Sequence, residues 1–549
     1  MSSVDVSTGV SADVLVEVTD LTVGFGSLRA VDGLSFTLEK GAALGLVGES
    51  GSGKSTVASA LLGLHRGTGA DVGGSVRVAG IDVQEASDAD LGRLRGGKAA
   101  MVFQDPLSSL DPYYAIGDQI AEVYRVHARV SRRAARARAV DVLDRVGIPD
   151  ALRRSRSRPH EFSGGMRQRA LIAMALACEP ELLIADEPTT ALDVTVQAQI
   201  LDLLHTLREE TGLGLLLVTH DVGVAAESVD EILVMRHGRA VEHGPVGTVL
   251  GAPAETYTQD LLGAVPRVDA RRVRSEGSSG SSPEASSAAP EVVLEATGLR
   301  REFGRGKRAF AAVDDVSLTV HRGETLGIVG ESGSGKTTLG RMLVGLLKPT
   351  AGEIKPGGGV RPDVQMVFQD PVSSLNPRRS VGESIADPLR ARGERDEGRI
   401  RARVRELLER VGLEGAHYDR YPHEFSGGQR QRVGIARALA ADPRVIVCDE
   451  PVSALDVTTQ AQVVALLGEL QRELGLALVF VAHDLAVVRQ VSDRVAVMRR
   501  GRIVEQGPAD EVYDSPQDPY TKELLAAVPA LDPEVAAQRR AVRRELATA

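Results

Sequence analysis

Long apolar runs are missing from this sequence. The two longest, GLGLLLV before Thr219 and LALVFVA before His483, fall well short of the roughly 20 residues needed to cross a bilayer. The first residues, MSSVDVSTGVSADV, have neither the basic start nor the apolar core of a secretory signal peptide. We therefore expect a soluble chain that does not enter the membrane itself.

Cysteine is almost absent. Cys178 and Cys448 are the only two among 549 residues, and they lie in different halves of the chain. This usage predicts a reduced, cytosolic chain without a disulfide, in which both thiols act as small buried apolar groups.

A basic excess is missing too. The chain has 65 Lys and Arg against 75 Asp and Glu, a formal net charge of −10, which offers no electrostatic footprint for a nucleic acid. The local basic run from Arg132 to Arg138 is interspersed with alanine, a pattern typical of a solvated helix face. We expect no nucleic-acid partner.

What the chain does contain is one ordered set of motifs, present twice. GESGSGK, VFQDP, FSGG, an Asp-Glu pair, ALD and a lone histidine follow one another in each half. The offset is 263 residues from Ser163 to Ser426, but 282 from Lys54 to Lys336. The second copy is therefore shorter by about 19 residues, nearly all of them between its glycine-rich loop and Gln369. We expect this deletion to trim a small antiparallel sheet.

The glycine-rich loops predict two phosphate sites. Their glycines let the backbone N–H groups turn inward, and the helix that follows adds its positive end. A lysine reaches the terminal phosphates, and the next hydroxyl is suited to Mg²⁺. The residues are Gly48, Gly51, Gly53, Lys54, Ser55 and Thr56 in the first loop and Gly330, Gly333, Gly335, Lys336, Thr337 and Thr338 in the second.

The acidic pairs and the histidines predict hydrolysis. Asp186 and Asp449 end apolar runs, so a buried strand delivers each carboxylate beside the loop as a magnesium ligand. Glu187 and Glu450 come next and are suited to polarise an attacking water. His220 and His483 end another apolar run and are suited to hold the terminal phosphate and the glutamate in register.

The FSGG motifs predict a second helix N-terminus in each half that binds phosphate. They consist of Ser163, Gly164 and Gly165, and of Ser426, Gly427 and Gly428. One half does not need two such helix ends for one nucleotide. The economical arrangement is that each half offers this end to the nucleotide held by the other half.

The segment 271–290, rich in Ser, Gly, Ala and Pro, reads as a flexible tether. It separates a first domain, 1–270, from a second domain, 291–549. Strands alternate with helices around each phosphate loop, which predicts a parallel α/β core.

This set of motifs resembles the ATP-binding cassette (ABC) ATPases over nearly the whole chain. The resemblance implies two tandem P-loop NTPase domains, each with a parallel α/β core, a small antiparallel β subdomain and a helical subdomain. It implies ATP and Mg²⁺ as cofactors, bound head to tail between the halves. It adds Gln104 and Gln369 as magnesium and nucleotide contacts, and Phe25 and Phe303 where an aromatic ring stacks on adenine. A buried core phenylalanine explains these two positions nearly as well.

Finer features are similar to the importers of dipeptides, oligopeptides and nickel. They include PHEFSGG, SSLDP or SSLNP after VFQDP, and the paired tails YTQDLLGAVP and YTKELLAAVP. The resemblance implies two transmembrane permease subunits, an extracytoplasmic solute-binding protein, and a peripheral place on the cytoplasmic face of the cell membrane. Peptide is the first cargo to expect, with nickel chelates, glutathione or oligosaccharides behind it.

Two departures from that group bear on the expectation. Met166 stands where the second copy has Gln429, and no cysteine cluster follows the tail motif, so we expect no iron–sulfur centre. The alternative class is a double cassette that acts on the ribosome or on nucleic acid. Such proteins usually have a long charged helical linker or zinc-ligating cysteines, and the sequence has neither.

Overall fold

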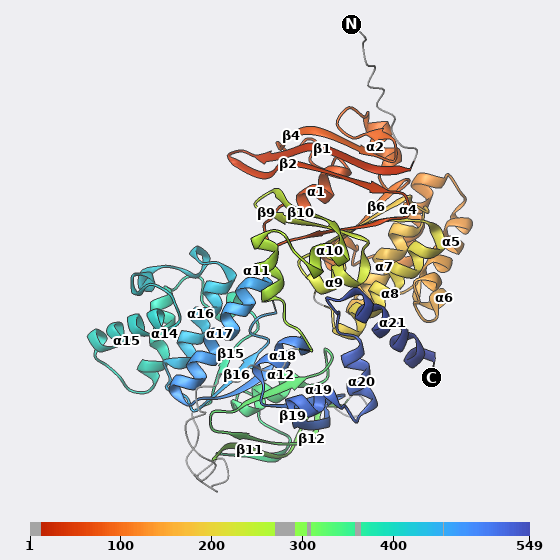
Figure 1. The fold of residues 1–549 in the computed structure, drawn as a ribbon. Helices are drawn as coiled ribbons and strands as arrows, with labels where there is room; N and C mark the ends of the chain where they lie inside the picture. Colours follow the sequence, from red (N-terminus) through yellow and green to blue (C-terminus); the bar gives the residue numbers. More distant parts are fainter. Residues whose placement is uncertain are drawn as a thin grey trace. The chain divides into compact units, whose positions relative to one another are not determined.

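The computed structural model describes residues 13–190, 192–269, 291–304, 309–356, 364–453 and 455–548. These form two compact units (Figure 1). Unit 1 comprises residues 1–192, 196–263 and 529–549, and unit 2 comprises residues 193–195 and 264–528. The tether expected at 271–290 lies outside the described residues.

Unit 1 is built on a six-stranded sheet in the order β10-β9-β3-β8-β7-β6. The strands β9, β3, β8, β7 and β6 are parallel, and the edge strand β10 is antiparallel to β9. The strands β3, β7 and β8 are buried along their whole length, because strands covered on both faces read as continuous apolar runs. The strands are β3 (Ala43–Val47), β6 (Ala99–Val102), β7 (Leu182–Asp186), β8 (Gly214–Thr219), β9 (Glu231–Arg236) and β10 (Arg239–Pro245).

Unit 1 also has a smaller antiparallel sheet, in the order β2-β1-β4-β5. Its apolar face shares one hydrophobic cluster with the parallel sheet and with α1, through residues such as Val16, Val57 and Leu216. The elements are β1 (Val14–Phe25), β2 (Leu28–Glu39), α1 (Lys54–Leu61), β4 (Asp71–Val78), β5 (Ile81–Asp82) and α2 (Asp88–Leu94).

The remaining helices form a helical subdomain and the outer layer of the unit. In the helical subdomain α4 packs on α5, and both contact α7. The helices are α3 (Pro106–Ser109), α4 (Ile116–Ala128), α5 (Arg132–Arg145), α6 (Ala151–Arg154), α7 (Gly164–Leu176), α8 (Val194–Thr211), α9 (Val222–Ser228), α10 (Val246–Gly251) and α11 (Thr256–Ala264). The last helix of the chain, α21 (Pro533–Thr548), also belongs to unit 1 and contacts α9.

Unit 2 repeats this plan. Its large sheet runs β15-β16-β17-β13-β18-β19 and its small sheet β12-β11-β14. The strands are β11 (Val292–Phe303), β12 (Phe310–His321), β13 (Thr325–Val329), β14 (Ala351–Pro356), β15 (Val364–Val367), β16 (Val445–Asp449), β17 (Ala477–Val481), β18 (Arg494–Arg499) and β19 (Arg502–Pro508). The helices are α12 (Lys336–Leu343), α13 (Pro371–Ser374), α14 (Val381–Ala391), α15 (Glu397–Arg410), α16 (Gly427–Leu439), α17 (Val457–Leu474), α18 (Leu485–Val491), α19 (Ala509–Asp514) and α20 (Pro519–Ala526).

The predicted fold class is confirmed. Each unit has a parallel α/β core, a small antiparallel sheet and a helical subdomain. Among the described residues, the small sheet has four strands in unit 1 and three in unit 2, and β5 and α2 have no counterpart before β15. No helix in the described parts of the chain is long and apolar enough to span a membrane.

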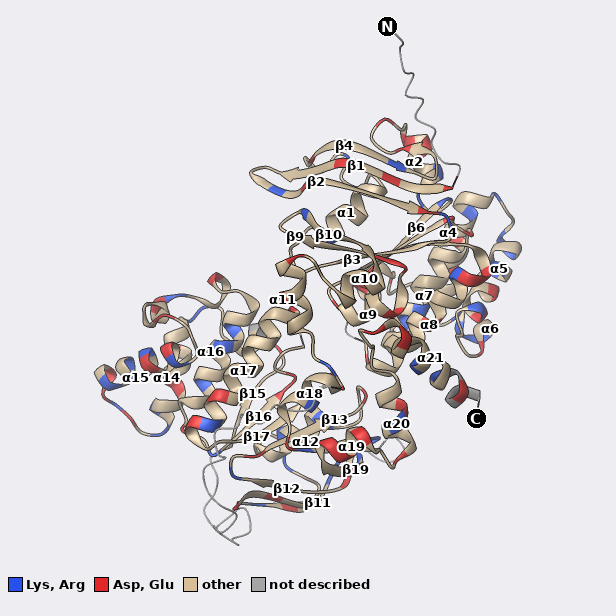
Figure 2. Ribbon diagram, viewed as in Figure 1, with Lys and Arg blue, Asp and Glu red and all other residues tan. Residues whose placement is uncertain are grey.

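The basic run in α5 is part of a mixed charged surface. Residues of both signs occur along the helical subdomains (Figure 2). Arg136 pairs with Asp118 at 3.0 Å, and Arg138 pairs with both Asp141 and Glu179 at 2.8 Å. These carboxylates offset the positive charge of the helix locally.

Candidate active sites

The first phosphate loop joins β3 to α1. Gly53 caps α1 in the left-handed conformation, with φ of 100°, and a Cβ there would lie 2.4 Å from the carbonyl oxygen of Ala30. Only glycine fits this position. Lys54 is 5% exposed, and its Nζ donates to the carbonyl oxygens of Gly48 and Glu49, both at 2.8 Å. The ammonium group thus lies inside the loop.

The second loop, from β13 to α12, has the same geometry. Gly335 has a φ of 106°, and a Cβ there would lie 2.2 Å from the carbonyl oxygen of Ala312. Lys336 Nζ donates to Gly330 at 2.7 Å and Glu331 at 2.9 Å. Burial lowers the pKa of both loop lysines.

A hydroxyl and a carboxylate meet beside each loop. Ser55 Oγ donates to Asp186 Oδ1 and Thr337 Oγ1 donates to Asp449 Oδ1, both at 3.0 Å. Burial raises the pKa of both aspartates, so a cation beside them would offset the cost of their charge. Oxygen donors of this kind suit Mg²⁺, which takes its other ligands from phosphate and water. The residues present therefore fit a magnesium ion.

The glutamate after each aspartate has an unusual backbone. Glu187 and Glu450 have φ of 47° and 46°, the left-handed region that non-glycine residues seldom adopt. Each backbone N–H donates at 2.8 Å to the end of the neighbouring strand, at Val218 or Val481. This turn directs the glutamate differently from the aspartate. Strained backbone of this kind is typical of functional positions.

Three side chains contact the first glutamate. Gln104 Nε2 donates to Glu187 Oε2 at 2.6 Å, Thr190 Oγ1 donates to the same oxygen at 2.9 Å, and His220 Nδ1 lies 3.1 Å from Oε1. In unit 2, Gln369 Nε2 donates to Glu450 Oε2 at 2.8 Å, and His483 Nδ1 lies 3.5 Å from that oxygen.

Each histidine and glutamate form an ion pair. Burial alone would raise the pKa of Glu187 and Glu450, but the histidine, through its hydrogen bond and charge, and the loop lysine outweigh burial and lower it. The hydrogen bond to Glu187 raises the pKa of His220 despite burial. Burial lowers the pKa of His483, but Glu450 outweighs it and the pKa is raised. Both glutamates are thus held ionised.

The FSGG motifs begin α7 and α16. Ser163 Oγ accepts from Met166 N and Ser426 Oγ accepts from Gln429 N, both at 3.3 Å. Gln429 also accepts from Ser426 N at 3.0 Å, which completes a capping box. Met166 has no oxygen for this bond, so the substitution changes the helix cap. Among the described residues, neither Ser163 nor Ser426 makes a hydrogen bond to the phosphate loop of its own unit.

The helix after each serine packs closely on a neighbour. A Cβ at Gly165 would lie 2.3 Å from Val196, and one at Gly428 would lie 2.3 Å from Thr459. Gly164 and Gly427 have room for a Cβ, so the second glycine of each motif is the one that packing requires.

The two phenylalanines expected at adenine end the first strand of each small sheet. Phe25 is 40% exposed and meets His65 edge to face, with ring centroids 5.6 Å apart. Phe303 is half-buried, and its ring centroid lies 5.9 Å from that of Phe310. The guanidinium carbon of Arg301 lies 4.9 Å from the same centroid. Phe25 is therefore not a buried core residue.

Sequence reasoning missed two contacts. Thr190 donates a hydrogen bond to the carboxylate of Glu187. The only sign of this contact in the sequence is that Thr190 follows Glu187 by three residues. Tyr520 contacts the second phosphate loop at Glu331, a contact that its tail motif does not predict.

Both cysteines are free thiols. Cys178 is half-buried and Cys448 is buried. Within the described ranges, no group of three or more His, Cys, Asp and Glu side chains is arranged to hold a metal ion. The absence of an iron–sulfur centre stays a prediction, which iron analysis of the pure protein tests.

Two phosphate loops, each with a hydroxyl–aspartate pair, a strained glutamate and a histidine, define a double P-loop ATPase. The ABC transporter family matches residues 31–190 and 313–453. The C-terminal region of oligopeptide/dipeptide transporters matches residues 241–290 and 504–548. The chain belongs to the ABC transporter family and is one of its ATPases.

Its similar relatives include glutathione import ATP-binding proteins. The protein GsiA of Salmonella choleraesuis is 46% identical over 96% of this chain and 92% of its own length. GsiA of Escherichia coli O6:H1 is also 46% identical, over 95% of this chain and 90% of its own. A solved structure of cbiO1 from Clostridium perfringens is 33% identical over 41% of this chain and 92% of its own, with a TM-score of 0.37.

Proposed function

We propose that this chain hydrolyses ATP to drive the import of short peptides, with glutathione as the first solute to test. The proposal rests on two complete sets of residues suited to hydrolysis. The chain that carries them is 46% identical to a glutathione import protein. The match to the oligopeptide/dipeptide C-terminal region supports a peptide-like solute.

We assign the side chains roles that follow from their chemistry. Lys54 and Lys336 bind the terminal phosphates, and their loop glycines present backbone N–H groups. Ser55 with Asp186, and Thr337 with Asp449, would hold Mg²⁺, which would neutralise phosphate charge. Glu187 and Glu450 polarise the attacking water. Gln104 and Gln369, with His220 and His483, orient these glutamates.

The head-to-tail arrangement stays a proposal. In it Ser163, Gly164 and Gly165 serve the nucleotide of the second loop, and Ser426, Gly427 and Gly428 that of the first. Phe25 and Phe303 stack on adenine. Site-directed crosslinking with and without ATP tests the arrangement, because only the nucleotide-loaded protein should then crosslink between an FSGG motif and the opposite phosphate loop.

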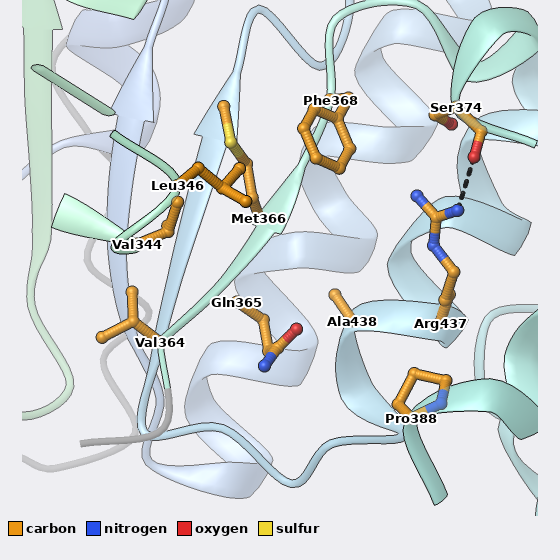
Figure 3. Close-up of a pocket in the computed structure, with 10 residues that line it drawn as sticks. All are labelled: Val344, Leu346, Val364, Gln365, Met366, Phe368, Ser374, Pro388, Arg437 and Ala438. Atoms are coloured by element: carbon orange, nitrogen blue, oxygen red, sulfur yellow. Dashed lines mark hydrogen bonds between the residues drawn. The ribbon is translucent and has the colours of Figure 1, made fainter. Parts of the chain in front are cut away.

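The transport role requires permease subunits, and unit 2 has a cavity suited to one. It has a volume of about 590 Å³ and lies between the end of α12, strand β15 and helices α14 and α16 (Figure 3). Leu346 is 62% exposed at its rim, Met366 and Phe368 line its wall, and Arg437 donates to the Ser374 carbonyl. Phe368 directly precedes Gln369, so a helix seated here would bear on the glutamine that contacts Glu450.

We propose that a short cytoplasmic helix of a permease subunit occupies this cavity. Leu346→Asp should weaken co-purification with the permease and lower transport while the chain keeps its basal ATPase activity. Leu474→Asp, at a leucine 38% exposed at the end of α17, is the matched control. Equal permease recovery with both variants contradicts this docking site.

The whole proposal is tested in the native cell. We would tag the Glu187→Gln, Glu450→Gln variant, solubilise membranes gently with ATP, and identify what co-purifies. Two permease subunits, with an extracytoplasmic binding protein, support a peripheral position on the cytoplasmic face of the membrane. Loss of labelled glutathione or dipeptide uptake on deletion of the gene then identifies the solute.

The second candidate is an ATPase that acts on the ribosome or on nucleic acid. The two tandem cassettes are the observation that favours it. Ribosomal proteins or nucleic acid in the same purification would support this class and overturn the transport proposal.

A further inference from the structure

The tail of unit 2 is fastened to the sheet that carries the phosphate loop. Glu505 of β19 accepts the backbone N–H groups of Gln517 at 2.8 Å and Asp518 at 3.1 Å. Asp518 then caps α20 by accepting from Tyr520 N at 2.8 Å. Unit 1 repeats the arrangement, since Glu242 accepts from Ala254 at 2.9 Å and Glu255 at 3.3 Å. The start of the tail helix is therefore fixed to an edge strand.

The first turn of α20 buries Tyr520 against the phosphate loop. Tyr520 is 1% exposed, and the guanidinium of Arg499 lies 4.4 Å from its ring centroid. Its hydroxyl oxygen accepts the backbone N–H of Glu331 at 3.1 Å. In unit 1, Arg236 lies 4.6 Å from the ring of Tyr257, the tyrosine of the first tail motif. The packing of the tyrosine under an arginine thus occurs twice in the chain.

The backbone of Glu331 makes two hydrogen bonds, one through its N–H and one through its carbonyl oxygen. Tyr520 accepts its N–H, and Lys336 Nζ donates to its carbonyl oxygen at 2.9 Å. The backbone here leads from Gly330, where a Cβ would lie 2.2 Å from the Met498 carbonyl oxygen, so the loop has little freedom at this point. Burial raises the pKa of Tyr520 to about 12, and the hydroxyl therefore stays neutral at physiological pH.

We propose that Tyr520 is a positioning residue for ATP binding at the second site, through which the C-terminal tail sets the geometry of the phosphate loop. Tyr520 holds the start of the loop through its hydrogen bond with Glu331. Lys336 and the backbone N–H groups expected to turn inward toward phosphate follow within the next residues. A phosphate loop gains affinity from preorganisation, because its N–H groups need not be ordered when the nucleotide binds. This role does not depend on which solute the transporter carries.

The test removes one oxygen atom. Tyr520→Phe keeps the ring under Arg499 but leaves the Glu331 N–H without its acceptor. Each variant is made in a Lys54→Ala background, so that binding of a fluorescent ATP analogue reports mainly on the second site. Tyr513→Phe is the matched control, because Tyr513 is also buried and its hydroxyl donates to the Leu485 carbonyl oxygen at 2.7 Å, away from the loop.

We expect Tyr520→Phe to weaken analogue binding at the second site about three- to tenfold, the range for one hydrogen bond. Tyr513→Phe should lower the melting temperature without changing this affinity. In the reciprocal Lys336→Ala background, which reports on the first site, Tyr520→Phe should leave the affinity unchanged. Unchanged binding by Tyr520→Phe at the second site, or an equal loss with Tyr513→Phe or at both sites, would overturn the proposal.

Discussion

At the scale of single residues, the strained glutamates carry the proposed chemistry. Glu187 and Glu450 lie in the left-handed region, and their side chains are 13% and 14% exposed. Replacing both by glutamine keeps the shape and the hydrogen bonds to Gln104 and Gln369 but removes the basic oxygen. We expect ATP turnover to fall by a factor of about 10² or more, while nucleotide binding persists.

Phosphate release under saturating ATP, together with equilibrium binding, measures this prediction. Glu181→Gln, at an exposed glutamate just before β7, is the control for loss of a carboxylate. Turnover within twofold of the unmodified protein in the double variant would remove both glutamates from the role of base.

The glycines of the first loop make a second prediction. Gly51 and Gly53 both have positive φ, 81° and 100°, but a Cβ at Gly51 meets open space while one at Gly53 would lie 2.4 Å from the Ala30 carbonyl oxygen. Gly51→Ala should cost about 1–2 kcal/mol of stability through backbone strain alone. Gly53→Ala should cost a further ~1–3 kcal/mol. Thermal denaturation of the two variants compares them directly, and equal melting temperatures would contradict the clash.

The sequence predicted the residues of each site more fully than their contacts. Lys54, Asp186 and Glu187 could be found because their chemistry needs fixed spacing within one loop or one strand end. The contact between Tyr520 and Glu331 joins residues 189 positions apart, and no local pattern encodes which hydroxyl reaches which N–H. Thr190 was missed because a threonine after an acidic pair has many structural uses.

At the scale of elements, the shortened segment of the second half has a defined consequence. In unit 1 it includes β5, α2 and Arg95, whose guanidinium donates to the carbonyl oxygens of Leu62 and Gly63 at 2.7 and 2.8 Å. The expected loss of part of the small sheet agrees with the three strands described in unit 2. Leu346 directly follows the residue of unit 2 that is equivalent to Gly63, and it is exposed. The shorter length of this segment alone does not predict that exposure.

Helix α21 makes another contact that the motifs did not predict. Arg543 pairs with Asp202 of α8 at 2.8 Å and with Glu227 of α9, which is 7% exposed. Arg540 also donates to the Glu227 carbonyl oxygen at 2.9 Å. Because α9 begins two residues after His220, α21 contacts the helix that directly follows this histidine.

This cluster makes stability depend on pH. Burial raises the pKa of Glu227 above 4.5, and Arg543 only partly opposes the shift. A carboxyl with a raised pKa favours the folded state below its ordinary pKa, and this contribution is lost as the pH rises through the folded value. Relative to Glu227→Gln, the unmodified protein should therefore become less stable as the pH rises from 4.5 to 7.5.

Denaturant unfolding across that range measures the difference. Glu255→Gln, an exposed glutamate of the same unit, controls for the change of charge. A difference that stays constant with pH, or one that grows in favour of the unmodified protein, would contradict the assigned direction.

At the scale of the whole molecule, the two sites have nearly the same geometry. The hydroxyl–aspartate distance is 3.0 Å in both, and the glutamine–glutamate distances are 2.6 and 2.8 Å. The sites differ in the histidine distance, 3.1 against 3.5 Å, in the helix cap at Met166, and in the contact of Thr190 with the Glu187 carboxylate. None of these differences removes a group that the proposed hydrolysis needs.

We therefore predict that both sites hydrolyse ATP. Glu187→Gln and Glu450→Gln, made singly, should each remove at least half of the turnover, because each removes one base from one of two equivalent sites. The rates that remain should agree within about twofold, since that factor corresponds to only ~0.4 kcal/mol in the barrier. Steady-state ATPase rates of the two variants, at equal protein and saturating nucleotide, check this. If one variant kept nearly the full rate while the other lost it, hydrolysis would belong to a single site, and the intact residues of the other would serve only to bind nucleotide.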